Sequence, residues 1–486
     1  MIAPGIRFLL AAALVMAGSP GLALAQSADA TADRLAANLE PRVRVEGREY
    51  GTRSLQDWMD EYDVPAVSVA VIDKGEIVWS RAWGLADAGA AIPATPDTLF
   101  RAGSLSKPVA AMVALDLVED GVLALDAPID PGLRRWRIPE NEFTRERPVT
   151  LRNLLDHTSG LPADTAAVGQ YAPEGPVPTL EQVLSGSPPA TTPPVRITAT
   201  PGSASEYTSA GYAIAQLLME DVTGQPFAEL ARRRVFDPLG MRSSTYAAPA
   251  NAAAGRFAAG HDGAGQPLAG GFRTSPELAG VGLFTTPTDL ARVLVALQES
   301  LAGRSETPLQ QASAGEMSRP EVGIYTAGLA AAGEGDALAL SLGGQHSGFH
   351  SLMIGFPARG QGAVLMVNGA RGDEVGAVLA AAIAEAYGWP SYRPTVIHRG
   401  PVDREKLQEA VGDYRLGART GQVLPGADGV SLEARIGPEN VFELIPQGGD
   451  LYLEAAMGLR VEFLRDAEGK VTGVQFGGRR LERIQP

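Results

Sequence analysis

The sequence contains no cysteine in 486 residues. This excludes disulfide bonds, thiolate metal ligands and attachment of a lipid to an N-terminal cysteine. Stability must therefore come from burial of a core, which a chain of this length permits. With 45% apolar and 20% charged residues, the composition is that of an ordinary globular protein long enough for two or three domains.

Positive charge is also scarce, since 41 basic residues face 56 acidic ones and the formal net charge is −15. A strongly acidic protein binds nucleic acid and anionic membrane surfaces poorly. We therefore expect no nucleic-acid partner and attribute the acidity to solubility. Only four of the basic residues are lysines.

Long hydrophobic runs are missing. The first 25 residues have the pattern of a secretory signal, with Arg7 as the lone charge, an apolar core from Phe8 to Ala17 and small residues at Ala23-Leu24-Ala25. That core is too short to span a bilayer, and no later segment approaches twenty apolar residues. We expect an exported protein, periplasmic or secreted, with no integral membrane segment after residues 1–25 are removed.

Recognisable cofactor motifs are absent as well. The sequence has no zinc-type His-Glu-x-x-His, no phosphate-binding Gly-rich loop with Lys and Ser/Thr, and no calcium loop. It also lacks the Gly-x-Ser-x-Gly elbow of α/β-hydrolases. We expect no metal and no cofactor, because the five histidines show no ligand spacing: His157, His261, His346, His350 and His398.

One of the four lysines closes the run Ser104-Leu105-Ser106-Lys107. Arginine keeps its proton at workable pH, whereas a lysine can lose it when its ammonium is desolvated. Pro108 lacks a backbone N–H and fits the first turn of a helix, so we predict a helix from near Ser104 to Gly121. Residues three apart on that helix are within side-chain reach. Ser104 is therefore a candidate nucleophile activated by Lys107, and a capping serine followed by a solvated lysine is the alternative.

Apolar periodicity and turn signals place the other elements. The pattern changes at Tyr387-Gly388-Trp389-Pro390, where Gly and Pro end a helix. We predict one domain over residues 26–390, a linker over 391–402 and a small antiparallel β domain over 403–486. The predicted strands of the first domain are 67–72, 77–83, 337–342, 350–356 and 363–368, and its helices include 54–62, 151–155, 180–184, 212–222, 286–297 and 373–387.

These segments resemble the serine β-lactamase and penicillin-binding-protein superfamily, in particular its class C β-lactamase-related branch of esterases and D-amino-acid peptidases. The resemblance covers about residues 53 to 388, and its pieces come in family order. They are Phe100-Arg101-Ala102-Gly103 before Ser104, Leu154-Leu155-Asp156-His157-Thr158-Ser159-Gly160-Leu161, Tyr207-Thr208-Ser209-Ala210-Gly211-Tyr212, Pro238-Leu239-Gly240-Met241 and Gly348-Phe349-His350-Ser351.

The resemblance implies an α+β fold, with an antiparallel sheet flanked by helices, a helical lobe and an active site between them. It also implies roles for individual residues. Ser104 attacks an acyl carbonyl, Lys107 shares in its deprotonation, and Tyr207 relays the proton to the leaving group. His157 belongs to a segment that braces the floor of the site, so we expect a structural role for it.

The chain departs from the family pattern in two motifs. Ser209 stands where the family has an asparagine, and its shorter side chain reaches less far toward a substrate amide. The third motif, Lys or His followed by x-Gly, reads either as His346-Ser347-Gly348 or as Leu342-Gly343-Gly344. We favour the second register, because 337–342 has the pattern of the strand that carries the motif.

In this register a leucine replaces the cation, and His346 lies in the adjoining turn, close enough to substitute for it. The oxyanion donors are then the backbone N–H groups of Ser104 and Gln345, or of Phe349 in the other register. The expected substrate-binding residues are Ser209, Gly344, Gln345 and His346.

Three functions remain open. The first is an exported serine hydrolase that forms an acyl-enzyme with ester, amide or peptide substrates without strong carboxylate recognition. The second is a cell-wall DD-peptidase or class C-like β-lactamase, for which a cation near position 342 or 346 is expected. The third is a catalytically silent binding protein of the same fold.

Overall fold

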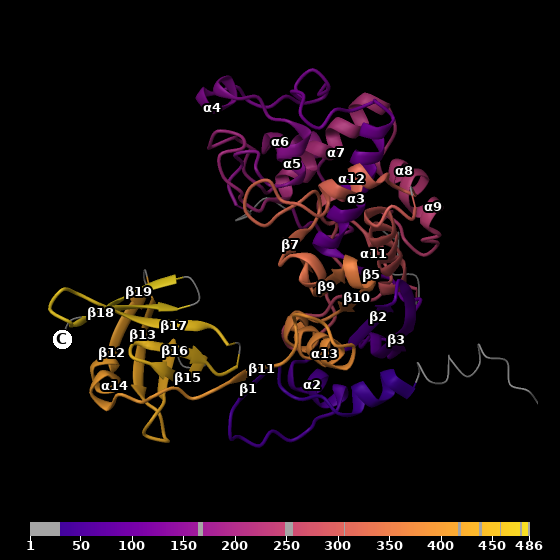
Figure 1. The fold of residues 1–486 in the computed structure, drawn as a ribbon. Coiled ribbons are helices and arrows are strands. Elements are labelled where there is room, and N and C mark those ends of the chain that lie inside the picture. Colours follow the sequence, from indigo (N-terminus) through magenta and orange to yellow (C-terminus); the bar gives the residue numbers. More distant parts are fainter. Residues whose placement is uncertain are drawn as a thin grey trace, which may run out of the picture.

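The computed structural model describes residues 30–163, 169–247, 256–305, 307–416, 419–436, 440–456, 458–476 and 479–484. The predicted signal segment, residues 1–25, lies outside them. Within these ranges no helix is both long enough and apolar enough to cross a membrane. The described chain forms a main body of sheet and helices with a separate β-barrel at its side (Figure 1).

The main body is built on a seven-stranded sheet in which all neighbouring strands are antiparallel. Its strand order is β4-β3-β2-β10-β9-β8-β7. Strands that are distant in the sequence thus lie in the centre, where both faces are covered and apolar residues run almost without interruption. The strands are β2 (Ala66–Asp73), β3 (Glu76–Asp87), β4 (Ile92–Pro93), β7 (Ala330–Ala332), β8 (Ala339–His346), β9 (Phe349–Phe356) and β10 (Gln361–Val367).

Helices cover both faces of this sheet. Alternate residues of a strand point to opposite faces. Val364 and Met366 of β10 accordingly belong to one core, together with α11 (Pro287–Leu301), whereas Leu365 and Val367 belong to another with α13 (Gly372–Ala386). The N-terminus of α11 is capped, because the Thr286 side chain accepts a hydrogen bond from the N–H of Asp289.

A helical lobe lies at one end of the sheet, at the top of Figure 1. Its central helix, α3 (Ser106–Glu119), is buried along most of its length and packs against α7 (Ser209–Thr223). A two-stranded sheet of β5 (Phe100–Arg101) and β6 (Phe284–Thr285) leads into the turn before α3. Other helices of the main body include α2 (Leu55–Glu61) on the α13 side of the sheet, and α4 (Glu142–Glu146), α5 (Leu151–Leu155), α6 (Leu180–Ser185), α8 (Phe227–Ala231), α9 (Asp237–Leu239), α10 (Leu278–Val281) and α12 (Gln311–Glu316).

The predicted C-terminal antiparallel β domain is a closed eight-stranded barrel, in which β12 pairs with β19. Its interior is filled by apolar side chains around a cavity of only about 20 Å³, so it is a packed core. Its strands are β12 (Gly412–Leu416), β13 (Arg419–Pro425), β14 (Leu432–Ile436), β15 (Asn440–Gly448), β16 (Leu451–Glu454), β17 (Arg460–Arg465), β18 (Val471–Phe476) and β19 (Arg479–Arg483).

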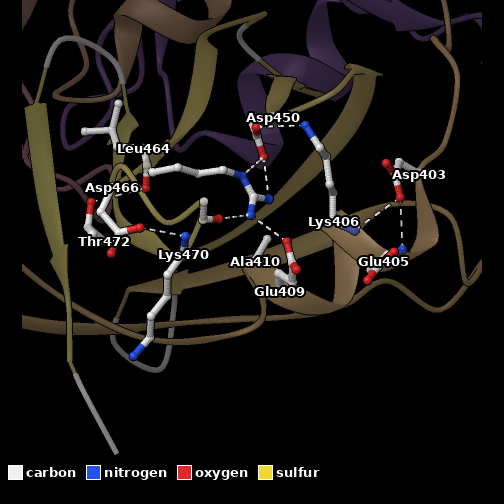
Figure 2. A network of polar contacts seen from close by, with 12 residues as sticks. Asp403, Glu405, Lys406, Glu409, Ala410, Asp450, Leu464, Asp466, Lys470 and Thr472 are labelled. Atoms are coloured by element: carbon white, nitrogen blue, oxygen red, sulfur yellow. Dashed lines mark hydrogen bonds and ion pairs between the residues drawn. The ribbon is translucent and has the colours of Figure 1, made fainter.

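Ion pairs attach helix α14 (Arg404–Ala410) to this barrel (Figure 2). Lys406 Nζ lies 3.1 Å from Asp450 Oδ2, and the other oxygen of Asp450 accepts two hydrogen bonds from Arg465. Arg465 also bonds to Glu409 of the helix. One arginine from a strand thus connects the helix to the loop that holds Asp450.

Part of the predicted linker, residues 391–402, has regular secondary structure. It contains β11 (Thr395–Ile397), which pairs in parallel with β1 (Val43–Val45). Ile397 and both valines of β1 pack against Ile445 of the barrel. The sequence does not reveal this strand because its partner lies about 350 residues away, and three residues are too few for a periodic signal.

Candidate active site

Ser104 lies at the junction between the helical lobe and the sheet. The predicted helix does not begin at Ser104, because residues Gly103–Leu105 form a 3₁₀ turn and the α-helix begins at Ser106. Gly103 has a φ of +54°, and a Cβ at this position would lie 2.9 Å from the backbone nitrogen of Gln345. Only glycine permits this approach. It places strand β8 directly beside Ser104.

Lys107 is fully buried, and its ammonium contacts three oxygen atoms. Its Nζ lies 3.0 Å from Ser104 Oγ, 3.0 Å from Ser209 Oγ and 3.1 Å from the carbonyl oxygen of Gly280. Among the described acidic side chains, none forms an ion pair with Lys107. In the neutral amine, two N–H groups keep the contacts to Ser209 and Gly280 while the lone pair faces Ser104. The geometry therefore suits a base for the Ser104 hydroxyl.

Ser209 begins α7, and the side chain of Thr208 caps this helix by accepting from the N–H of Ala210. The Ser209 hydroxyl lines the same pocket as Ser104 while it contacts Lys107. The serine that stands in place of the family's asparagine thus contacts the lysine, although its side chain reaches less far toward a substrate.

His157 fixes the backbone on both sides of Tyr207. Its carbonyl oxygen accepts from the N–H of Glu206 at 2.8 Å, and its Nδ1 accepts from the N–H of Thr208 at 3.1 Å. The ring centroids of His157 and Tyr207 are 4.4 Å apart, and Lys107 Nζ lies 4.9 Å from the Tyr207 ring. His157 is therefore a positioning residue for the tyrosine that faces the lysine.

His157 carries no positive charge at neutral pH. Burial, reinforced by the charge of Lys107, lowers its pKa to about 3. Because Nδ1 accepts a hydrogen bond, the proton of the neutral ring is on Nε2. The histidine that holds the backbone around Tyr207 therefore adds no second positive charge near Lys107.

Tyr325 is a site residue that the sequence analysis missed. Its ring centroid is 5.1 Å from that of Tyr207 and 5.0 Å from that of His157, and the half-buried side chain lines the pocket. It lies in the segment between α12 and β7, outside every motif that carries the resemblance. A lone tyrosine in an irregular segment gives no local signal, so only the fold reveals this placement.

Strand β8 passes the backbone of Ser104 at Gly344. A Cβ on residue 344 would lie 2.3 Å from the carbonyl oxygen of Ala102 and 3.2 Å from the nitrogen of Ser104. Ser351 of β9 supports this arrangement, because its hydroxyl donates to the same Ala102 oxygen at 2.8 Å. The close approach favours the register Leu342-Gly343-Gly344 for the third motif, with the backbone of Gln345 beside Gly103.

His346 lies in β8, and not in a turn after a strand that ends at 342. The strand continues because His346 pairs with Phe349, so the turn is confined to the two residues between them. His346 is 3% exposed, and neither ring nitrogen has a hydrogen-bond partner among the described residues. Burial and the charge of Arg101 hold its pKa well below the usual range. A neutral His346 does not replace the missing cation.

The pocket around Ser104 has a volume of about 750 Å³. Of the predicted site residues, all but the buried Lys107 line it. Within the described part of the chain, no group of three or more acidic or histidine side chains is arranged to hold a metal ion. The predicted residues that line the pocket are Ser104, Tyr207, Ser209, Gly344, Gln345 and His346.

Asp156, next to His157, is expected to make stability depend on pH. Burial raises its pKa to about 6, although Thr158 donates two hydrogen bonds to Oδ1. A pKa raised on folding means that the folded state binds the proton more tightly, so stability falls as pH rises from about 4 to 6. Asp156→Asn keeps the acceptor oxygen without the charge. It is expected to raise the free energy of unfolding at pH 8 by up to about 3 kcal/mol.

Urea unfolding of both proteins at pH 8 and pH 4 measures this effect. The gain should vanish at pH 4, where the wild-type carboxyl is largely protonated in the folded state. An equal difference at both pH values, or a less stable variant at pH 8, would contradict a buried charge at this position.

The main body matches a known protein family. The beta-lactamase family profile matches residues 52–388. Esterase EstB of Burkholderia gladioli is 34% identical over 222 residues, which cover 41% of this chain and 52% of the esterase. Penicillin-binding protein 4 of Amycolatopsis lactamdurans is 30% identical over 187 residues, or 38% of this chain and 45% of that protein. The chain thus spans about half the length of these curated relatives.

A solved structure shows the same arrangement of the main body. The D-amino acid amidase of Ochrobactrum anthropi SV3, complexed with L-phenylalanine, is 26% identical with a TM-score of 0.55, and the likeness covers 68% of this chain and 96% of the amidase. The predicted α+β architecture is confirmed by this likeness and by the sheet and helices described above. The family match covers most of the chain and contains Ser104, Lys107 and Tyr207. The chain therefore belongs to the beta-lactamase family of serine hydrolases.

Proposed function

We propose that this chain hydrolyses ester or small amide substrates through an acyl-enzyme on Ser104. The contact that carries the proposal is the 3.0 Å approach of Lys107 Nζ to Ser104 Oγ in a buried site. A lysine held there by two further acceptors can take the hydroxyl proton without moving. EstB and the amidase, as similar proteins, support esters and amides as the substrate classes.

The proposed reaction has two halves. Lys107 takes the proton of Ser104 Oγ, which attacks the acyl carbonyl, while the backbone N–H groups of Ser104 and Gln345 hold the oxyanion. The bond to the leaving group breaks and Tyr207 supplies that group with a proton. Water then attacks the acyl carbon and gives one proton to the Tyr207 phenolate left by the first half. The Ser104–acyl bond breaks, Lys107 returns its proton to Ser104 Oγ, and the acid is released.

Neutral substrates fit this pocket better than substrates with a carboxylate beside the scissile bond. In the register that we favour, Leu342 stands where the family has a cation, and burial lowers the pKa of His346 and favours its neutral form. A hydrogen-bonded cation at such a place favours a carboxylate by about 10- to 100-fold. Ser209, Gly344, Gln345 and His346 are proposed to contact the uncharged substrate. Export of the protein is part of the proposal and rests on the composition of residues 1–25.

The test compares kcat/KM for p-nitrophenyl butyrate and D-alanine p-nitroanilide with that for a D-Ala-D-Ala peptide and a penicillin. We expect the uncharged ester to exceed both carboxylate-bearing substrates by at least about 10-fold. Preference for the peptide or the penicillin would instead assign a DD-peptidase or β-lactamase. Binding of these compounds without turnover of any would favour a silent protein.

A further inference from the structure

The pocket that contains Ser104 continues around the edge of the sheet. Strand β7 pairs only with residues 339–341 of β8, so β8 is an edge strand from Leu342 onward. Besides Ser104 and Tyr207, the pocket is lined by Leu365 of β10 and by Gly376 of α13, which lie on the opposite face of the sheet. The space thus passes from the helical lobe, around β8, to the α13 side.

We call this second part the α13 furrow. The pairing register places Gly343 opposite Leu352, and Leu352 opposite Leu365, so these three positions share the α13 face. Paired residues of neighbouring antiparallel strands point to the same side. The furrow is lined by Gly343, Gln345, His350, Leu352, Leu365, Val367, Gly372, Asp373, Gly376 and Ala377.

Two glycines leave the furrow open. A Cβ added at Gly343 or at Gly376 would meet no atom within 4 Å. Neither glycine is required by a close backbone approach, whereas Gly344 is. A side chain at either position would occupy the furrow. Glycine at both positions therefore leaves the furrow free for a ligand.

The floor of the furrow is apolar and carries no cation. Leu365 and Val367 are 1% and 2% exposed, and Leu352 and Ala377 are partly exposed beside them. Among the described residues that line it there is no lysine or arginine, and the one carboxylate is the exposed Asp373. Such a surface binds methylene and methyl groups, whereas Asp373 repels a chain that ends in a carboxylate.

We infer that the α13 furrow binds an uncharged apolar chain of the substrate, joined to the carbonyl group that Ser104 attacks. This rests on the proposed function, and names its substrates as esters or amides with an extended apolar substituent. The chain crosses the edge strand at Gly343, where no side chain obstructs it, and ends over Leu365 and Val367. Each methylene bound there is expected to raise kcat/KM up to about fourfold.

The test is the chain-length dependence of kcat/KM for p-nitrophenyl acetate, butyrate, hexanoate and octanoate, with a parallel series of alkyl acetates to vary the leaving group. Wild-type protein and the variant Gly376→Leu are compared, since a leucine there fills the furrow and is a better helix former than glycine. We expect the ratio of kcat/KM for the longest chain to that for the shortest chain, in one of the two series, to fall at least tenfold in the variant. The series that responds identifies whether the acyl or the alcohol chain occupies the furrow.

Ala386→Leu is the matched control, because it adds a leucine to the exposed last turn of the same helix, outside the furrow. Its ratios should equal those of the wild type. Unchanged ratios in Gly376→Leu for both series would overturn the inference.

Should the wild type hydrolyse no ester, the proposed function fails, and calorimetric titration with octanamide and acetamide then tests the furrow alone. Binding of octanamide that Gly376→Leu weakens tenfold supports the furrow, and equal binding by both proteins overturns it.

Discussion

Ser104→Ala is expected to lower kcat/KM for p-nitrophenyl butyrate by at least about 10⁴-fold, because the variant lacks the atom to which the acyl group is transferred. The fold should persist. The substituted side chain is small, and Lys107 keeps its contacts with Ser209 and the Gly280 carbonyl. The measurement is steady-state hydrolysis by both proteins, with thermal unfolding to show that the variant is folded.

Ser106 provides the matched control for this substitution. It lies two residues away and is also buried, but its hydroxyl donates to the Gly103 carbonyl and accepts from the N–H of Leu283. Ser106→Ala should therefore reduce stability more than Ser104→Ala while it retains far more turnover. Activity of Ser104→Ala within tenfold of the wild type would remove Ser104 from the mechanism.

Lys107→Arg is expected to lower kcat/KM by at least about 10³-fold, as much as Lys107→Ala, although it keeps the positive charge. A guanidinium does not release its proton at workable pH, so it cannot accept one from Ser104. Lys470→Arg, on the exposed surface of the barrel, makes the same exchange far from the site and should leave turnover unchanged.

Lys107 is fully buried, so Lys107→Arg also introduces a larger side chain into a packed region. Lys107→Met provides a neutral side chain of similar length and should show the same loss in a protein whose unfolding temperature is measured alongside. If the arginine variant were to retain turnover within tenfold of the wild type, a fixed positive charge alone would be sufficient. The lysine would then not be the base.

Local patterns predicted most of the main body. The 3.6-residue periodicity before Leu301 indicated α11, and the strand-like runs of residues 67–72 and 77–83 indicated β2 and β3. Barrel closure was not predictable, since Tyr414 of β12 pairs with Arg483 of β19 across almost the whole domain. The end of β8 was placed too early because glycine disfavours strands, whereas pairing with β9 extends this one to His346.

The site was predictable to the extent that it is local. Ser104 and Lys107 are three residues apart, so their spacing alone indicated the contact. Tyr207 was identified only through the family resemblance. The backbone beside it is held by a hydrogen bond to His157, which lies about 50 residues away in the sequence. No periodic pattern indicates a contact of that kind. The same holds for Tyr325, and for the α13 furrow, which depends on where a short strand stops covering its neighbour.

The most direct test of the acyl-transfer account is to locate the covalent bond. The chain is incubated with an alkyl fluorophosphonate, which stays attached to an activated serine, and the labelled peptide is identified by mass spectrometry. The account predicts one label per chain on Ser104, its absence in Ser104→Ala, and slow labelling in Lys107→Arg. A label on another residue, or ester turnover by a chain in which Ser104 remains unlabelled, would contradict it.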